Sequence, residues 1–172
     1  MSKEIITLWR RLYRIYKPRK AISAKKLKAR KAPKIVLKHL GDHYNLSEVY
    51  QSVNALYFEN KLDLPITWFG SKKSVPKRRL TLGTYNSRSQ LIKIHRLLDQ
   101  AHVPYHVISY VVYHEMLHHV LPPIKERWQK RKIHHAAFKA REREFQEYSL
   151  IKEFHKTLRD TGFQSIAPLN KL

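Results

Sequence analysis

The segment between Pro104 and the Pro122-Pro123 pair determines much of how this chain can fold. Proline is favoured at the first position of a helix and cannot continue one, so this segment predicts a helix that starts at Pro104 and stops before Pro122. Apolar residues cover much of its surface, namely Val107, Ile108, Val111, Val112 and Leu117. A helix with this pattern is mostly buried, so the rest of the chain has to pack around it.

A second helix is predicted from residue 45 to about residue 60. Asn45 is followed three residues later by Glu48, as in a capping box, and apolar residues then recur at spacings of three and four. Three short runs of aromatic and β-branched residues follow this helix, and they predict strands at 65–70, 80–85 and 91–95.

The pattern predicts one more helix, from about His135 to Leu158, with Phe138 and Phe145 on its inner side. We therefore expect the α+β class. An N-terminal helix and a short three-stranded or larger sheet would pack on the helix that starts at Pro104, and the C-terminal helix would complete the domain.

Cysteine is absent from the 172 residues, which excludes disulfides, thiol nucleophiles and cysteine-based zinc ribbons or fingers. Any bound metal must therefore use His, Asp or Glu as ligands. No apolar run has the length of a membrane span or of a signal peptide, so we expect a soluble cytoplasmic protein.

Positive charge is concentrated at the N-terminus. The chain has 35 Lys and Arg against 13 Asp and Glu, a formal charge of +22, and residues 1–38 hold 14 of the cations against one acid. We assign residues 1–44 to a basic extension, with a short amphipathic helix that ends near Lys17 and a solvated arm after it. Such an extension favours DNA or RNA binding without sequence specificity, with a solubilising tail or an anionic membrane surface as alternatives.

The predicted central helix contains the pattern H-E-x-x-H, in the sequence His114-Glu115-Met116-Leu117-His118. Residues four apart lie one turn apart on the same face of a helix, so the imidazoles of His114 and His118 can hold one Zn²⁺. Glu115 points about 100° away from His114, which leaves its carboxylate free to act as a base on water that the metal activates. The alternative is a pair of hydrogen-bonded core histidines.

A catalytic zinc site needs a third protein ligand and one open position. The downstream candidates are His119, His134, His135, Glu142 and Glu144. His119 follows His118 directly and points to another side of the same helix, which argues against it. Spacing does not choose among the others.

Several segments of the chain resemble the SprT-like, or Spartan-type, zinc metalloprotease domain, from residue 45 to about residue 150. They are Leu56-Tyr57-Phe58-Glu59-Asn60-Lys61-Leu62, Ile66-Thr67-Trp68, Leu82-Gly83-Thr84-Tyr85, Ile92-Lys93-Ile94, the segment Val111 to His118, and His134-His135-Ala136-Ala137-Phe138. The resemblance implies a zincin-like domain over residues 45–172, with one Zn²⁺ on His114, His118 and His134. His135, which stands where the family commonly has Gly, is the alternative third ligand.

The same resemblance implies hydrolysis of peptide bonds in a protein substrate, with Glu115 as the general base, and an association with DNA. It also implies that an extended substrate pairs with the strand at 91–95. Two other functions fit the sequence. One is a nucleic-acid-binding protein with a structural or catalytically idle metal site, and the other is a metal-dependent hydrolase of another class.

Overall fold

The structure is a computed structural model, and it describes residues 36–72, 80–125 and 131–161. The chain divides into two compact units, residues 1–35 and Val36–Leu172, and all the described residues belong to the second. The predicted basic helix and the arm after it lie outside the described residues. Within the described part, no helix combines the length and the apolar character that a membrane crossing requires.

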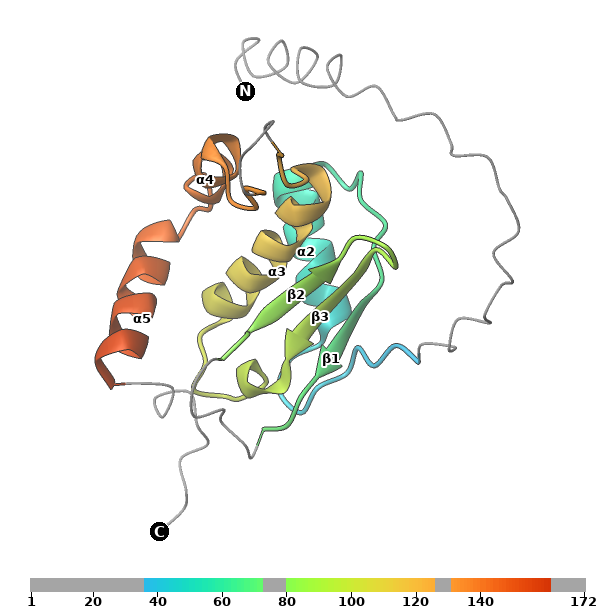
Figure 1. The fold of residues 1–172 in the computed structure, drawn as a ribbon. Coiled ribbons are helices and arrows are strands. Elements are labelled where there is room, and N and C mark those ends of the chain that lie inside the picture. The colour runs from blue at the N-terminus through green and yellow to red at the C-terminus, as the bar shows by residue number, and fades with distance from the viewer. Residues whose placement is uncertain (1–35, 73–79, 126–130, 162–172) are drawn as a thin grey trace. The chain divides into compact units, whose positions relative to one another are not determined.

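The second unit belongs to the α+β class, as predicted, with a small mixed sheet (Figure 1). Its strands are β1 (Ile66–Phe69), β2 (Gly83–Asn86) and β3 (Leu91–His95), in the spatial order β1-β3-β2. Strand β3 runs parallel to β1 and antiparallel to β2. The expectation that 91–95 offers an edge to a substrate is therefore wrong, because β3 is paired on both sides and β2 is an outer strand.

Helix α2 (Leu46–Phe58) forms where the spacing of apolar residues predicts it. Asn45 is its N-cap residue, and the side-chain oxygen of Asn45 accepts a hydrogen bond from the N–H of Ser47 at 3.0 Å. In a capping box, Glu48 would accept from the backbone N–H of Asn45. Here Glu48 accepts instead from the side-chain amide of Asn45, at 2.7 Å. The inner face of α2 buries Leu46, Val49 and Val53 in the core.

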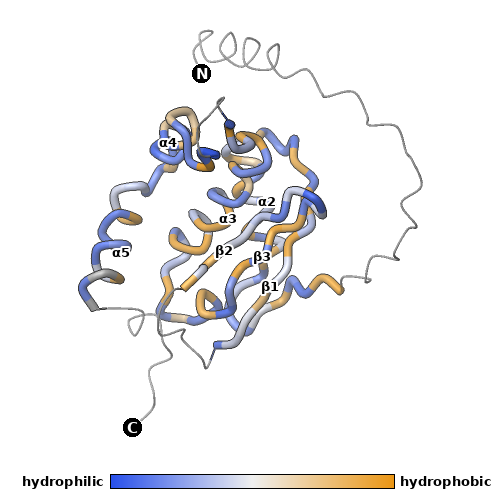
Figure 2. The backbone as a smooth tube through the Cα atoms, viewed as in Figure 1, coloured by the Kyte–Doolittle hydropathy of each residue, from blue (hydrophilic) through white to orange (hydrophobic). Residues whose placement is uncertain are grey.

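Helix α3 (Tyr105–Val120) is the central element of this unit, and Pro104 is its N-cap residue. Helix α3 contacts strands β2 and β3, and α2 contacts strand β1. Because α2 and α3 also contact each other, these two helices cover the same face of the sheet. The residues that are fully buried along α3 are Ile108, Val112, Tyr113, Met116 and Leu117. Figure 2 shows hydrophobic residues along α3 and β3, in line with the prediction of a mostly buried helix.

One long C-terminal helix was expected, and the structure has two instead. Helix α4 (Ala136–Glu142) and helix α5 (Tyr148–Thr161) are separated by a turn in which Glu144 and Phe145 donate backbone hydrogen bonds to the carbonyls three residues earlier. The break turns Phe145 inward, where its ring stacks on Tyr57 at a centroid distance of 5.5 Å. Tertiary packing of this aromatic residue therefore outweighs the helical periodicity of the segment.

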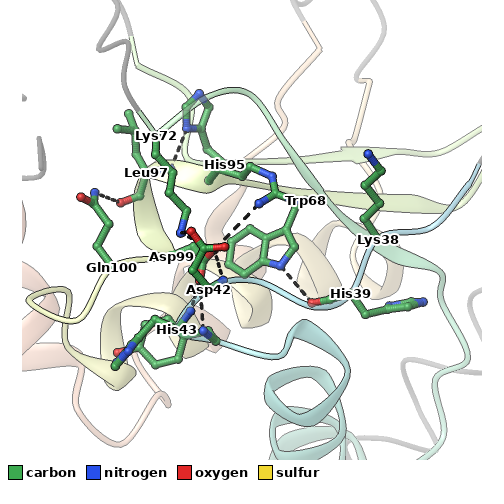
Figure 3. A network of polar contacts seen from close by, with 12 residues as sticks. Lys38, His39, Asp42, His43, Trp68, Lys72, His95, Leu97, Asp99 and Gln100 are labelled. Carbon is green, nitrogen blue, oxygen red and sulfur yellow. Dashed lines mark hydrogen bonds and ion pairs between the residues drawn. The ribbon is translucent and has the colours of Figure 1, made fainter.

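Residues 36–44, which we predicted to be part of the basic extension, belong to the second unit and contact the sheet and the loop after β3. Trp68 donates from its backbone N–H to the carbonyl of Lys38 at 3.0 Å, and from its indole N–H to the carbonyl of His39 at 2.9 Å. The fully buried carboxylate of Asp99 accepts the backbone N–H groups of residues 42, 43 and 44 at 2.7 to 3.0 Å. Lys72 pairs with the same carboxylate at 2.8 Å (Figure 3).

Candidate metal centre

Three histidine side chains converge beside helix α3. His114 and His118 lie one turn apart on α3, and His134 comes from the segment before α4. The Nε2 atom of His118 lies 3.2 Å from Nε2 of His114 and 3.3 Å from Nε2 of His134. One nitrogen from each of the three rings lies within 4.8 Å of the other two, which is close enough for a shared metal ion.

The spacing of these nitrogens fits a tetrahedral ion. Zinc binds imidazole nitrogen at about 2.0 to 2.1 Å, so two nitrogens on a tetrahedral ion are about 3.3 to 3.4 Å apart. The two separations from Nε2 of His118, 3.2 and 3.3 Å, are close to this value. The donor set therefore fits Zn²⁺ in number and type and in these two spacings, and among the residues that the structure describes no fourth side chain joins the group.

The loop between α3 and α4 brings His134 to the other two histidines. Ile124 and Lys132 form an antiparallel bridge across this loop, with reciprocal backbone hydrogen bonds of 3.0 and 2.9 Å. The ring of Phe138, fully buried at the start of α4, lies under the cluster. Its centroid is 4.7 Å from the rings of His118 and His134 and 5.2 Å from that of His114. An apolar platform of this kind restricts the orientations of the three rings.

Glu115 lies on the side of α3 that faces strand β2. Its side chain is buried against Gly83, where a Cβ atom would come within 2.7 Å of the carboxylate oxygen Oε1. Burial raises the pKa of Glu115 to about 7, although the charge on His114 and a hydrogen bond from the backbone N–H of Tyr85 act in the opposite direction. A carboxylate with such a pKa is suited to accept and return a proton near neutral pH.

Glu142, a sequence candidate for the third ligand, has a different position. Its Oε1 atom lies 2.8 Å from Nδ1 of His114, on the opposite side of the ring from the converging nitrogens. The hydroxyl of Tyr110 donates to the same oxygen at 3.0 Å. Burial by itself would raise the pKa of Glu142, but the hydrogen bonds and charge of these neighbours lower it. Glu142 therefore contacts a candidate ligand instead of the metal position.

The other candidates also lie outside the cluster. The Nδ1 atom of His119 lies 2.8 Å from the hydroxyl of Tyr85. His135 is the N-cap residue of α4, and Glu144 forms an ion pair with Arg141. Among the described residues, the structure brings together His114, His118 and His134 as a possible metal-binding group.

Two histidines of the cluster, His118 and His134, favour their neutral forms because their pKa values are lowered. Burial, together with the nearby His114 and His134, lowers the pKa of His118 to about 4. Burial also lowers the pKa of His134. Neutral imidazoles keep a lone pair available, which is the form that binds a metal.

Sequence reasoning did not assign roles to Tyr110 and Gly83. The spacing of four residues indicates that Tyr110 and His114 lie on the same face of a helix. The contact of Tyr110 with Glu142, however, depends on where α4 ends. The close approach of Gly83 to Glu115 joins two distant segments and has no local pattern.

Comparison of the chain with family models, curated proteins and solved structures gave no match.

Proposed function

We propose that this chain is a zinc-dependent metallopeptidase. The single observation that carries the proposal is the convergence of the three imidazole nitrogens, with two separations of 3.2 and 3.3 Å, next to helix α3, which also carries the buried carboxylate of Glu115. Three histidines with an open fourth position and a carboxylate on the same helix are the parts that zinc-dependent hydrolysis requires. The likeness of residues 45 to 150 to SprT-like domains points to peptide bonds as the substrate.

Each residue of the site has a defined part in this proposal. His114, His118 and His134 would hold the ion, and bound Zn²⁺ supplies Lewis-acid chemistry that polarises a carbonyl group and makes water more nucleophilic near neutral pH. Glu115 accepts the proton of the attacking water and gives it to the leaving amine. The backbone N–H of Tyr85 and the contact with Gly83 keep the carboxylate of Glu115 in one place during both transfers.

Strand β2 is the element that would align an extended peptide. His95 of β3 donates its N–H to the carbonyl of Leu82, so the alternation of an antiparallel pair directs the backbone groups of Gly83 and Tyr85 away from β3. A peptide that adds to this edge would lie next to Glu115. Because the N–H of Tyr85 already donates to Glu115, the peptide would pair with the backbone groups of Gly83 and the carbonyl of Tyr85.

We further propose that the peptidase acts on proteins associated with DNA. The formal charge of +22, with 14 of the 35 cations in residues 1–38, supports a polyanionic partner. The second candidate is a nucleic-acid-binding protein with a structural or idle metal site, because the same charge supports binding without catalysis.

Replacement of Glu115 by Gln separates the two functions. The E115Q variant should bind zinc and DNA as the wild type does, but its cleavage of a denatured protein or of the chain itself should fall by at least about 100-fold, because the proton acceptor is lost. A Glu153→Gln variant, which changes an exposed carboxylate on α5, is the matched control. Equal cleavage by E115Q and wild type, or no cleavage by zinc-loaded wild type with and without DNA, would contradict the peptidase proposal.

A further inference from the structure

Three residues of α3 form one row along the helix. Tyr110, His114 and His118 are spaced by four residues each, so their side chains lie one turn apart on the same face. Glu142, at the end of α4, contacts two of the three through a single atom. Its Oε1 is 2.8 Å from Nδ1 of His114 and 3.0 Å from the hydroxyl of Tyr110.

In a neutral His114, this geometry favours one of the two ring nitrogens as the site of the proton. An ionised carboxylate has only acceptor sites, so a hydrogen bond to it requires the proton of His114 to lie on Nδ1. The proton on Nδ1 leaves a lone pair on Nε2, and Nε2 is the atom that lies 3.2 Å from Nε2 of His118. The carboxylate therefore selects the tautomer in which His114 can bind a metal on the side of the cluster.

Glu142 is carried by helix α4, and other contacts hold this helix in place independently of the carboxylate. The hydroxyl of Tyr113 donates to the carbonyl of Arg141, the residue before Glu142, at 2.6 Å. Phe138 is fully buried one turn earlier on α4. The side chain of Glu142 is 14% exposed, so competition from water for its oxygen is limited. Because α4 is fixed at two points, loss of the carboxylate need not move the helix.

We propose that Glu142 is a positioning residue for the metal ligand His114 and that the hydroxyl of Tyr110 positions Glu142 in turn. The proposal rests on the metal site proposed above and extends it to the residues that orient its ligands. A carboxylate behind an imidazole holds the ring orientation and raises the basicity of the ligating nitrogen. Removing such a partner typically lowers metal affinity by about 10- to 100-fold.

The test compares four proteins: wild type, Glu142→Ala, Tyr110→Phe and the control Glu144→Ala. Glu144 is 54% exposed and pairs with Arg141, so its removal changes the charge near α4 without a contact to the cluster. Zinc affinity is measured by competition with a chromogenic chelator, and the protonated nitrogen of His114 is read from ¹H–¹⁵N correlation spectra of the metal-free proteins. Circular dichroism confirms that each variant is folded.

We expect E142A to bind zinc about 10- to 100-fold more weakly than wild type and Y110F to lose less than about tenfold, with E144A unchanged. In metal-free wild type the proton of His114 should be on Nδ1, and in E142A it should shift to Nε2. If E142A is misfolded, the tautomer of His114 in wild type still decides the matter. Wild-type affinity in folded E142A, or a proton on Nε2 of His114 in wild type, overturns the proposal.

The two readouts separate this proposal from the proposed function. Absence of zinc binding by every protein, wild type included, would contradict the metal site, and the tautomer of metal-free His114 would still test the action of Glu142. Zinc binding with an unaffected E142A would contradict the positioning role and leave the peptidase proposal intact.

Discussion

At the scale of single residues, the candidate site depends on a close approach between helix α3 and strand β2, for which a small residue is required. Gly83 is the clearest case, because the Cβ of any other residue would come within 2.7 Å of Oε1 of Glu115 and 2.8 Å of a methyl group of Val111. The absence of a side chain at Gly83 therefore lets Glu115 lie against strand β2.

Gly83→Ala tests this contact. The added methyl group should displace the carboxylate of Glu115, and we expect kcat to fall by about 10- to 100-fold, since small misplacements of a catalytic group carry such costs. Zinc affinity should change little, because the atoms nearest to the added methyl group belong to Glu115 and Val111 and not to the histidines. The control is Thr84→Ala, an exposed neighbour on the same strand. A G83A variant with wild-type kcat would show that this contact does not place Glu115.

Asp99 predicts a pH dependence of stability. Burial would raise the pKa of this carboxyl group, but the hydrogen bonds from Lys72 and from three backbone N–H groups outweigh burial and lower the pKa to about 2. The folded-state pKa lies below the unfolded value of about 3.9, so the stabilising effect is complete above about pH 5 and is lost as the pH falls toward 2. We expect the free energy of unfolding to decrease by about 2 kcal/mol over this interval from Asp99 alone.

Urea unfolding at a series of pH values measures this effect. Asp99→Asn should lower the free energy of unfolding at pH 7 by about 3 kcal/mol, because Lys72 and the backbone donors lose their ionised partner. In this variant the free energy of unfolding should also decrease less between pH 5 and pH 2. Asp42→Asn, which removes the 78% exposed partner of Lys72, should cost less than about 1 kcal/mol. An equal decrease in the free energy of unfolding between pH 5 and pH 2 in D99N and wild type would contradict this assignment.

At the scale of elements, helices α3 and α4 each bring part of the site to one place. Helix α3 supplies two histidines, and the loop after it returns through the Ile124–Lys132 bridge to supply the third. A bound ion would therefore connect α3 to this loop and restrain the bridge.

Hydrogen exchange detects this restraint. The amides of Ile124 and Lys132, which donate to each other's carbonyls, should exchange at least about tenfold more slowly when zinc is present than after treatment with a chelator. The increase in protection should be absent in His134→Ala and should persist in His135→Ala. Equal protection with and without zinc would mean that the ion does not join these elements.

The sequence predicted those elements whose formation depends on local patterns. The helix of residues 46–58 and the helix of residues 105–120 form close to the expected positions, since capping residues, prolines and apolar spacing all act within a few residues. The break between α4 and α5 was not predicted, because the inward turn of Phe145 depends on Tyr57 and Tyr113, which are distant in the chain. For the same reason, the sequence left Glu142 as one of several candidate ligands and did not indicate its contact with His114.

At the scale of the whole molecule, the positive charge is unevenly distributed, and a large share of it lies outside the second unit. The residues outside the second unit hold 13 of the 35 cations against one acid. If the chain binds DNA through phosphates, affinity should fall steeply with salt, and the slope of log K against log salt should decrease when residues 1–35 are deleted.

Fluorescence anisotropy with a labelled duplex of unrelated sequence measures this binding. Deletion at residue 35 leaves the segment 36–44 in contact with the sheet, so the truncated chain should keep its thermal unfolding midpoint while it loses most of its DNA affinity. An unchanged affinity would place the DNA contacts in the second unit, and a salt-independent affinity would exclude phosphate neutralisation as the main interaction.

The proposed activity depends on one metal ion held by His114, His118 and His134. Metal analysis of the purified protein, together with anomalous scattering at the zinc edge from its crystals, tests this most directly. We predict one zinc per chain and a single anomalous peak at about 2.0 to 2.1 Å from one nitrogen of each histidine. A protein that contains no metal after zinc is supplied, or a peak at any other group of residues, would contradict the account.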